Sequence, residues 1–328
     1  MQQSSIENSF ASSSSGMIAS SDRNHEVLVE FKNAQGQPIS RNYPKNYKKL
    51  FISLVILFMT TYSNGLAIAY VNKFSKTTYN STKPLNDITF SLFSRQRWAW
   101  KAADMTVAAC AAISIIVILL HRCNTIVLRR MALLASMLYY FRFICIMSTQ
   151  LPPPFEDFHE RCLEPIDIAQ NFSYYLIEAG KVVFNLGTTD VDSKFLCGDT
   201  IYSGHTLVAV LLVCFVCHYC PTALQPWIPA CSILLGISSV IFVIISRQHY
   251  TIDCIISVLL TLILFAWYHS WIMVEHQYSN KWKYLLMNIL VYFEEDVPPG
   301  QLPNELAFPD PNVITMNDFF RKYFTIRR

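Results

Sequence analysis

The sequence predicts an all-α integral membrane protein with six transmembrane helices and both termini in the cytosol. Hydrophobic residues make up 52% of the 328 residues and charged residues only 15%, against about 25% charged residues in an average soluble domain. The apolar residues gather in runs of about 20, the length that crosses about 30 Å of hydrocarbon. A net charge of +3 gives no indication of nucleic-acid binding.

The chain divides into three predicted segments. Residues 1–45 are polar and serine-rich without periodicity, so we expect a disordered cytosolic tail. Residues 46–275 form the expected six-helix transmembrane domain, and residues 276–328 form a polar cytosolic tail that contains several prolines. The six apolar runs are Phe51–Val71, Trp98–Leu120, Ile126–Met147, Tyr202–Cys220, Trp227–Ile245 and Ile252–Val274.

Basic residues near the ends of the runs predict the orientation, because short cytosolic loops carry an excess of Lys and Arg. Lys48 and Lys49 precede the first run, Arg122 follows the second, and Lys281 and Lys283 follow the sixth. With six spans, all of these lie on the side of the termini, which is therefore expected to be cytosolic. The loop between the first two runs disagrees, since it holds five basic residues on the expected outer side. The three agreeing segments outweigh it.

Two features of the outer loops agree with this orientation. The tripeptides Asn80-Ser81-Thr82 and Asn171-Phe172-Ser173 have the pattern of N-glycosylation acceptors. Each lies in one of the two longer loops that the six-span topology puts outside. Cys162 and Cys197 share the second of these loops, which faces an oxidising compartment in this topology. The sequence leaves two alternatives for them, a disulfide and two free thiols.

Two histidines lie where chemistry is expected, at the outer ends of the fourth and sixth runs. His249 and Asp253 are four residues apart, so on a helix they would share one face. A carboxylate that accepts a hydrogen bond from one ring nitrogen orients the imidazole and leaves the other nitrogen free to act as a nucleophile or base. A structural ion pair is the simpler alternative for two such residues.

His205 follows Ser203 and Gly204 at the predicted start of the fourth span. The unpaired backbone amides of a helix start favour a phosphate group, and a glycine lets a substrate approach the backbone closely. An imidazole at this place can donate a proton to a leaving alkoxide and later take one from an acceptor hydroxyl. A single interfacial histidine is an ordinary residue, but two polar motifs at one membrane depth favour a functional site.

Each of two further charged residues, Arg142 and Asp199, has two possible interpretations. Arg142, near the outer end of the third run, either binds the phosphate of a substrate or plays a structural role, by snorkelling to the interface or by pairing with Asp104. Asp199 either orients a basic residue or caps the fourth helix, and capping is the simpler expectation.

Four motifs carry a resemblance to a known family. Cys197-Gly198-Asp199 with Ser203-Gly204-His205-Thr206 matches the third family motif, and His249-Tyr250 with Asp253 matches the fourth. Pro84-Leu85-Asn86-Asp87 is similar to the first. The second is represented by Arg129-Arg130, Tyr139, Arg142, Thr149, Leu151 and Pro152, and Trp267-Tyr268-His269 is also typical. Over residues 45–276 the chain resembles the sphingomyelin synthase family of the lipid phosphate phosphatase superfamily.

The resemblance implies a lipid phosphotransferase that moves phosphocholine from phosphatidylcholine to ceramide, giving sphingomyelin and diacylglycerol. It implies His249 as nucleophile through a phosphohistidine, Asp253 as its partner and His205 as acid and base, without a metal or other cofactor. We expect the substrates to contact Arg142, Asp199, Ser203, Gly204 and Gln248. The family also implies a multi-pass protein of the Golgi or plasma membrane with a lumenal or extracellular active site, and it leaves homo-oligomers open.

Two departures from the family pattern bear on the choice of substrate. Asn86 replaces a proline of the first motif, which we expect to alter a loop rather than the chemistry. Gln248 stands where the family usually has an acidic residue that could meet a cationic head group, so transfer of phosphoethanolamine to ceramide is the first alternative. The second alternatives are a lipid phosphate phosphatase, whose basic motifs we do not find, and a six-span transporter without catalysis.

Overall fold

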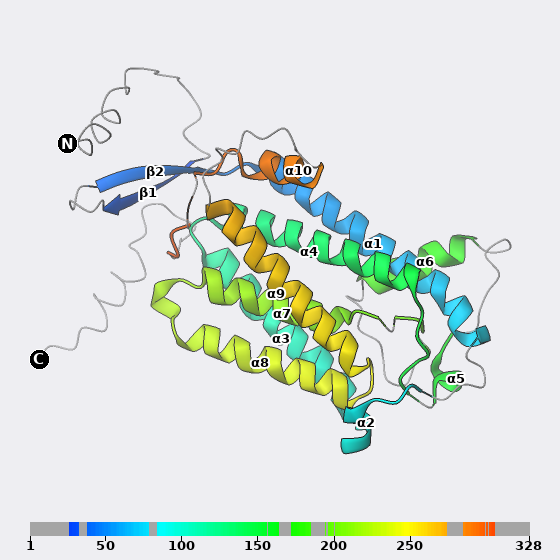
Figure 1. Cartoon of the computed structure of the whole chain (residues 1–328). Helices are drawn as coiled ribbons and strands as arrows, with labels where there is room; N and C mark the ends of the chain where they lie inside the picture. Colours follow the sequence, from blue (N-terminus) through cyan, green and yellow to red (C-terminus); the bar gives the residue numbers. More distant parts are fainter. Residues whose placement is uncertain are drawn as a thin grey trace, which may run out of the picture.

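The computed structural model describes residues 26–32, 38–78, 84–155, 157–163, 172–184, 194, 196–199, 201–273, 285–298, 300 and 302–305. Long helices dominate this part of the chain and lie side by side in a bundle (Figure 1). The long helices are α1 (Tyr47–Thr78), α3 (Trp98–Leu120), α4 (Asn124–Ser148), α7 (Gly204–Tyr219), α8 (Trp227–Ile245) and α9 (Thr251–Met273). The shorter elements are β1 (Glu26–Lys32), β2 (Pro38–Pro44), α2 (Ile88–Leu92), α5 (Phe158–Arg161), α6 (Phe172–Phe184), the 3-10 helix η1 (Thr222–Leu224) and α10 (Leu285–Glu294).

Five of the long helices are long and apolar enough to cross a membrane, which agrees with the predicted all-α integral membrane protein. They are α1 over Tyr47–Asn72, α3, α4, α8 and α9. The fourth predicted run forms α7, which is apolar but has only 16 residues. At 1.5 Å per residue α7 is about 24 Å long, shorter than the hydrocarbon core of about 30 Å. The six-span count and the orientation of the termini therefore stay predictions.

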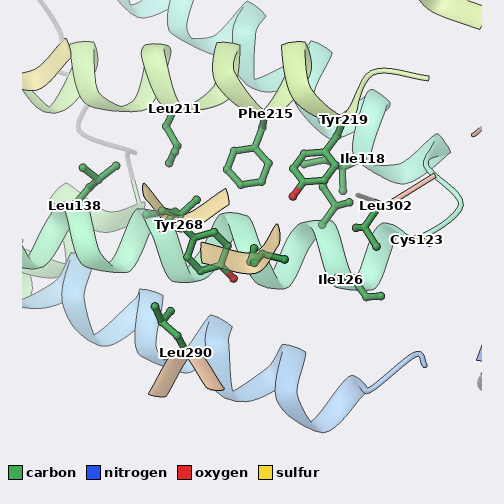
Figure 2. Close-up of a cluster of buried hydrophobic side chains, with 14 of the residues drawn as sticks. Ile118, Cys123, Ile126, Leu138, Leu211, Phe215, Tyr219, Tyr268, Leu290 and Leu302 are labelled. Carbon is green, nitrogen blue, oxygen red and sulfur yellow. The ribbon is translucent and has the colours of Figure 1, made fainter. Parts of the chain in front are cut away.

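The helix α7 lies inside the bundle, where it packs against α3, α8 and α9, while α1 packs along α4. Apolar side chains of α4, α7 and α9 fill the space between these helices, as Figure 2 shows for Leu138, Leu211, Phe215 and Tyr268. Because α7 is surrounded by other helices, residues at its N-terminus can be reached by side chains from several distant parts of the sequence.

The expectation of a disordered tail over residues 1–45 is wrong for part of this segment. Strands β1 and β2 pair antiparallel, from Glu26 opposite Pro44 to Lys32 opposite Pro38. The segment of β1 reads Glu-Val-Leu-Val-Glu-Phe-Lys, and such β-branched and aromatic residues favour strands. Each strand has only seven residues. The serine-rich composition of the whole tail therefore hides both strands.

Part of the predicted C-terminal tail also packs on the bundle. Helix α10 buries Leu290 and Phe293, and Figure 2 shows Leu290 facing the apolar cluster. At the end of α10, Glu294 accepts hydrogen bonds from Arg130 of α4, at 2.6 Å from Nη2, and from Tyr268 of α9, at 2.8 Å from Oη. The sequence predicted a polar tail here, whereas Glu294 and Asp296 pair with Arg130 and Arg129 near the N-terminal end of α4.

At the opposite end of the bundle, the loop residues Cys162 and Cys197 form a disulfide with a Cα–Cα distance of 5.4 Å. Of the two alternatives for these cysteines, the structure has the paired one. The nearby helix α6 packs against α1 (Figure 1), with Tyr62 Oη donating to the carbonyl oxygen of Leu176 at 3.1 Å. This end of the bundle also holds α2 and α5, and the histidine motifs lie here.

Candidate active site

The start of α7 provides the centre of the candidate site. Ser203 is the N-cap residue, and its Oγ accepts a hydrogen bond from the backbone nitrogen of Thr206 at 3.4 Å. The preceding residue, Tyr202, has a φ of 66°, a left-handed conformation that is costly for a residue with a bulky side chain. Helix α7 begins at Gly204, two residues after this position.

Arg142 lies directly against this helix start. Its side chain is buried, and its Nε donates to the carbonyl oxygen of Tyr202 at 2.9 Å. A Cβ atom added to Gly204 would lie 3.2 Å from both Cζ and Nη2 of Arg142. Glycine at this position therefore gives the guanidinium its place beside the first turn of α7, where it can meet an anion bound to the helix N-terminus.

Two side chains hold the other nitrogens of Arg142. Its Nη2 forms a short ion pair with Asp199, and its Nη1 lies 3.4 Å from Oδ1 of Asn64 in α1. The pair between Arg142 and Asp104 that we considered is therefore wrong. The expectation that Asp199 caps the fourth helix is also wrong, since Ser203 is the cap, and the alternative that Asp199 orients a basic residue is found instead.

Asp104 in α3 contacts a different partner, His205. The distance from His205 Nε2 to Asp104 Oδ1 is 2.7 Å, and both side chains are mostly buried, with exposed fractions of 17% and 16%. Sequence reasoning missed Asp104 as a site residue. The available signal was a carboxylate inside an apolar run, because ionisable groups at membrane depth are costly and are usually retained for function.

His249 lies just before α9 and is 5% exposed. Burial lowers the pKa of its ring to about 4, against the opposing effect of the Asp199 charge, while Arg142 and His205 lower it further. The imidazole is therefore neutral near pH 7, as a nucleophile must be. Asp199, Arg142 and His205 all affect the charge of the His249 ring, so the ring belongs to the group of charged side chains around the start of α7.

The hydrogen bond expected between His249 and Asp253 is not found within the described part of the chain. Helix α9 begins only at Thr251, so His249 does not share a helical face with Asp253. Asp253 Oδ2 instead accepts a hydrogen bond from the backbone nitrogen of Tyr250 at 3.0 Å, and Nδ1 of His249 is buried without a hydrogen-bond partner among the described residues. The carboxylate fixes the backbone next to the histidine rather than the ring itself.

The first motif explains why α9 begins where it does. Asp87 accepts from the backbone nitrogen of Thr251 at 2.8 Å and from its Oγ1 at 2.9 Å. Burial alone would raise the pKa of the Asp87 carboxylate, but these bonds and those from Thr89 hold this pKa below its ordinary value. Tyr250 Oη accepts from Leu85 N at 3.1 Å and donates to Pro152 O at 2.9 Å. Residues of the first, second and fourth motifs thus form one hydrogen-bonded frame around His249.

Gln248 is the remaining predicted site residue. It is 8% exposed, and its backbone nitrogen donates to the carbonyl oxygen of Val243 at 3.2 Å. Its Nε2 is buried, and no acceptor for it is found among the residues that the structure describes. A buried amide nitrogen next to the catalytic candidate His249 is therefore available to a group that enters the site.

The assembled site combines two imidazoles with one guanidinium at the start of a helix. Arg142 contacts Asp199 and the start of α7, His249 lies within the electrostatic influence of this group, and Asp253 binds the backbone of Tyr250. A positive side chain and a helix N-terminus suit a phosphate, and the two histidines suit nucleophilic attack and proton transfer. Within the described ranges, no three His, Cys, Asp or Glu residues lie together as metal ligands would.

Comparison with known proteins agrees with this chemistry. Residues 196–270 match the PAP2 superfamily C-terminal family, a range that contains both histidines. Phosphatidylcholine:ceramide cholinephosphotransferase 2 of Caenorhabditis elegans is 32% identical over 260 residues, which cover 74% of this chain and 74% of that protein. Phosphatidylcholine:ceramide cholinephosphotransferase 1 of the same organism is 31% identical over 252 residues, or 75% of this chain and 51% of that protein. The Homo sapiens protein of that name is 26% identical over 278 residues, or 82% and 65%.

Proposed function

The chain belongs to the phosphatidylcholine:ceramide cholinephosphotransferase family, and from this premise we propose that it transfers phosphocholine from phosphatidylcholine to ceramide. The products are sphingomyelin and diacylglycerol. The observation that carries the proposal is the convergence of His205, His249 and Arg142 at the start of α7. This arrangement provides a nucleophile, a proton donor and an anion-binding group around one point.

In the first step, a ring nitrogen of His249 attacks the phosphorus of phosphatidylcholine. A nitrogen–phosphorus bond forms, the bond from phosphorus to the diacylglycerol oxygen breaks, and the electron pair stays on that oxygen. Protonated His205 donates its proton to this oxygen, so neutral diacylglycerol leaves. Arg142 and the first amides of α7 stabilise the negative charge on the phosphoryl oxygens.

In the second step, the primary hydroxyl of ceramide attacks the same phosphorus. His205, now neutral, takes the hydroxyl proton as the oxygen–phosphorus bond forms. The nitrogen–phosphorus bond breaks and returns its electron pair to His249, which regenerates the starting enzyme. Asp104, 2.7 Å from His205, stabilises the positive charge that alternates on that ring. Asp253 positions Tyr250 and hence the backbone of His249.

Gln248 bears on the head group. A carboxamide cannot form an ion pair with either choline or ethanolamine, so this position supplies no charge that favours one of them. We propose phosphocholine as the transferred group because the names of the similar proteins contain phosphatidylcholine and cholinephosphotransferase. Ceramide phosphoethanolamine is the alternative product, which the experiment below separates from sphingomyelin by mass.

We place the reaction on the lumenal or extracellular side of the Golgi or plasma membrane. The disulfide between Cys162 and Cys197 lies at the same end of the bundle as the site, and such bonds persist in oxidising compartments. The basic residues at the opposite ends of the spans support the same orientation.

The test uses the full chain in detergent with phosphatidylcholine, phosphatidylethanolamine and a fluorescent ceramide, and mass spectrometry of the products. We expect labelled sphingomyelin from the unmodified protein and a loss of at least about 10²-fold in turnover for His205→Ala and His249→Ala. His218→Ala, in the last turn of α7, is the matched control and should keep its turnover. Full activity of either site variant contradicts the proposal.

The covalent intermediate has its own test. Without ceramide, the protein mixed with phosphatidylcholine that carries a radioactive phosphate should retain the label on His249 and release diacylglycerol in equal amount. A phosphorus–nitrogen bond is labile in acid and stable in base. Label that survives acid, or label of the same amount on the His249→Ala variant, excludes the phosphohistidine.

A further inference from the structure

The loop that carries Asp199 is bound to α1 through the side chain of Asn72, near the end of the apolar span. Oδ1 of Asn72 accepts a hydrogen bond from the backbone nitrogen of Cys197 at 2.7 Å, and its Nδ2 donates to the carbonyl oxygen of Leu163 at 3.2 Å. Asn72 is 4% exposed. Cys197 is bonded to Cys162, the residue before Leu163. One amide group therefore binds the backbone on both sides of the disulfide.

The residue after Cys197 continues this attachment. Gly198 has a φ of 120°, and a Cβ atom at this position would lie 2.8 Å from Cγ1 of Val71, the neighbour of Asn72. Only glycine fits both the conformation and the contact. The chain direction after Gly198 is thus set by the last part of the α1 span, and this direction leads to Asp199.

Asp199 connects this loop to the Arg142 guanidinium, the proposed phosphate-binding group. Its carboxylate pairs with Nη2 of Arg142, while Asn64, two turns before Asn72 on α1, accepts from Nη1 at 3.4 Å. The guanidinium is thus held on two sides by α1, once directly through Asn64 and once through the loop. Its remaining nitrogen, Nε, is bound to the carbonyl oxygen of Tyr202.

We propose that Asn72 and the Cys162–Cys197 disulfide are positioning elements for the transfer reaction, which hold Asp199 and through it the Arg142 guanidinium at the start of α7. In this proposal these three residues act through Asp199 and not by contact with the substrate. The inference rests on the proposed phosphoryl transfer, in which Arg142 stabilises the transition state. A displacement of about 1 Å of such a group can cost about 10²-fold in rate, so a distant amide has a measurable effect.

The decisive experiment is a double-mutant cycle on turnover with phosphatidylcholine and fluorescent ceramide. We expect Asn72→Ala to lower kcat about 10-fold and to change KM for phosphatidylcholine less than about 2-fold. Asp199→Asn should lower kcat by a larger factor. If Asn72 acts through Asp199, the double variant should be no slower than Asp199→Asn alone, because contacting residues of one network are not additive.

A purely structural role for Asn72 gives different results. In that case the two kcat losses multiply in the double variant, or the loss of Asn72→Ala follows only from less folded protein, and either outcome overturns the proposal. Asn304→Ala is the matched control, since Asn304 Nδ2 also donates to a backbone carbonyl, that of His218 at 2.8 Å, on another part of α7. It should change kcat less than about 2-fold.

The disulfide gives a second variant that does not depend on Asn72. The Cys162→Ser/Cys197→Ser double variant should show the same selective loss of kcat, whereas Cys217→Ser and Cys231→Ser, at exposed free cysteines, should not. An unchanged kcat of the double-serine variant overturns the role of the disulfide.

Hydrogen exchange separates this inference from the proposed function. Amides of residues 197–204 should exchange faster in Asn72→Ala than in the unmodified chain or Asn304→Ala, whether or not any lipid product is made. If the unmodified protein makes no sphingomyelin or related lipid but the exchange result holds, the proposed function fails and the attachment stands. If the protein is active and exchange is unchanged, the inference alone fails.

Discussion

Asp104 of α3 and His205 of α7 are 101 residues apart in the sequence, and their side chains lie within 2.7 Å of each other. The contact exists because α3 packs along α7. The carboxylate–imidazole pair of this site therefore lies at His205, the proposed acid and base, whereas the spacing of the fourth motif suggested a pair at His249.

Asp104→Asn tests this relationship. The amide keeps the size of the side chain but removes the negative charge that stabilises protonated His205, so we expect kcat to fall about 10²-fold. The measurement is turnover with fluorescent ceramide at saturating phosphatidylcholine. Asp157→Asn is the control, because Asp157 is a carboxylate in the segment between α4 and α5 that pairs with Arg95 and Arg161 instead. Equal activity of the two variants removes Asp104 from the mechanism.

The pKa of His249 predicts how stability depends on pH. Since burial lowers this pKa from 6.5 to about 4, the unfolded chain binds more protons than the folded one between these values. Stability is then complete above pH 6.5 and decreases as the pH falls towards 4. Thermal unfolding at pH 7 and pH 5 should show a smaller difference for His249→Gln than for the unmodified protein.

His121 provides the comparison for that measurement. It lies between α3 and α4, and burial lowers its pKa to about 4 as well. His121→Gln should therefore reduce the pH dependence of unfolding in the same direction, yet leave transfer activity per folded molecule unchanged. If the unfolding of His249→Gln keeps the full pH dependence, the pKa of the His249 ring is not lowered in the folded state.

Gly204→Ala tests the close approach of Arg142 to the start of α7. The new methyl group would lie 3.2 Å from the guanidinium, so Arg142 must move by several tenths of an ångström. We expect kcat to fall about 10-fold with little loss of stability, because misplaced electrostatic groups lose their effect in the transition state. Gly180→Ala is the control: its Cβ would meet nothing within 4 Å, and its turnover should not change.

The buried pair at the other end of α4 predicts a stability effect without a catalytic one. Arg130 and Glu294 are both 2% exposed, and removing one partner leaves an unpaired buried charge. We expect Glu294→Ala to lower the free energy of unfolding by about 3–5 kcal/mol. Glu305→Ala removes an exposed partner of Arg122 and should cost at most about 1 kcal/mol. Similar unfolding midpoints for both variants would falsify the assignment of a stabilising role to Glu294.

Local patterns in the sequence predicted most of the long helices. The runs Trp98–Leu120 and Trp227–Ile245 coincide with α3 and α8, because predominantly apolar runs of about 20 residues leave few alternatives. Gly204 and Arg142 lie next to each other, their roles in a site stay predictions, and the predicted family is confirmed by the similar proteins.

The contacts between distant segments were beyond sequence reasoning. The spacing of His249 and Asp253 assumed a helix through both, but Asp87 sets the start of α9 at Thr251 from 164 residues away. The choice of Asp199 over Asp104 as partner of Arg142 likewise depends on how the loop after the disulfide meets α1. Neither of these two contacts can be predicted from periodicity or motif spacing.

The two arginines of α4 have a mechanical consequence. Arg130 is fixed by Glu294 near one end of the helix and Arg142 by Asp199 near the other, about 18 Å apart along the axis at 1.5 Å per residue. Since the two carboxylates belong to different segments, α4 cannot slide or rotate about its axis without breaking at least one ion pair. Helix α4 is therefore held at both ends, and we expect the other helices of the bundle to move first if the bundle opens for the lipids of the proposed reaction.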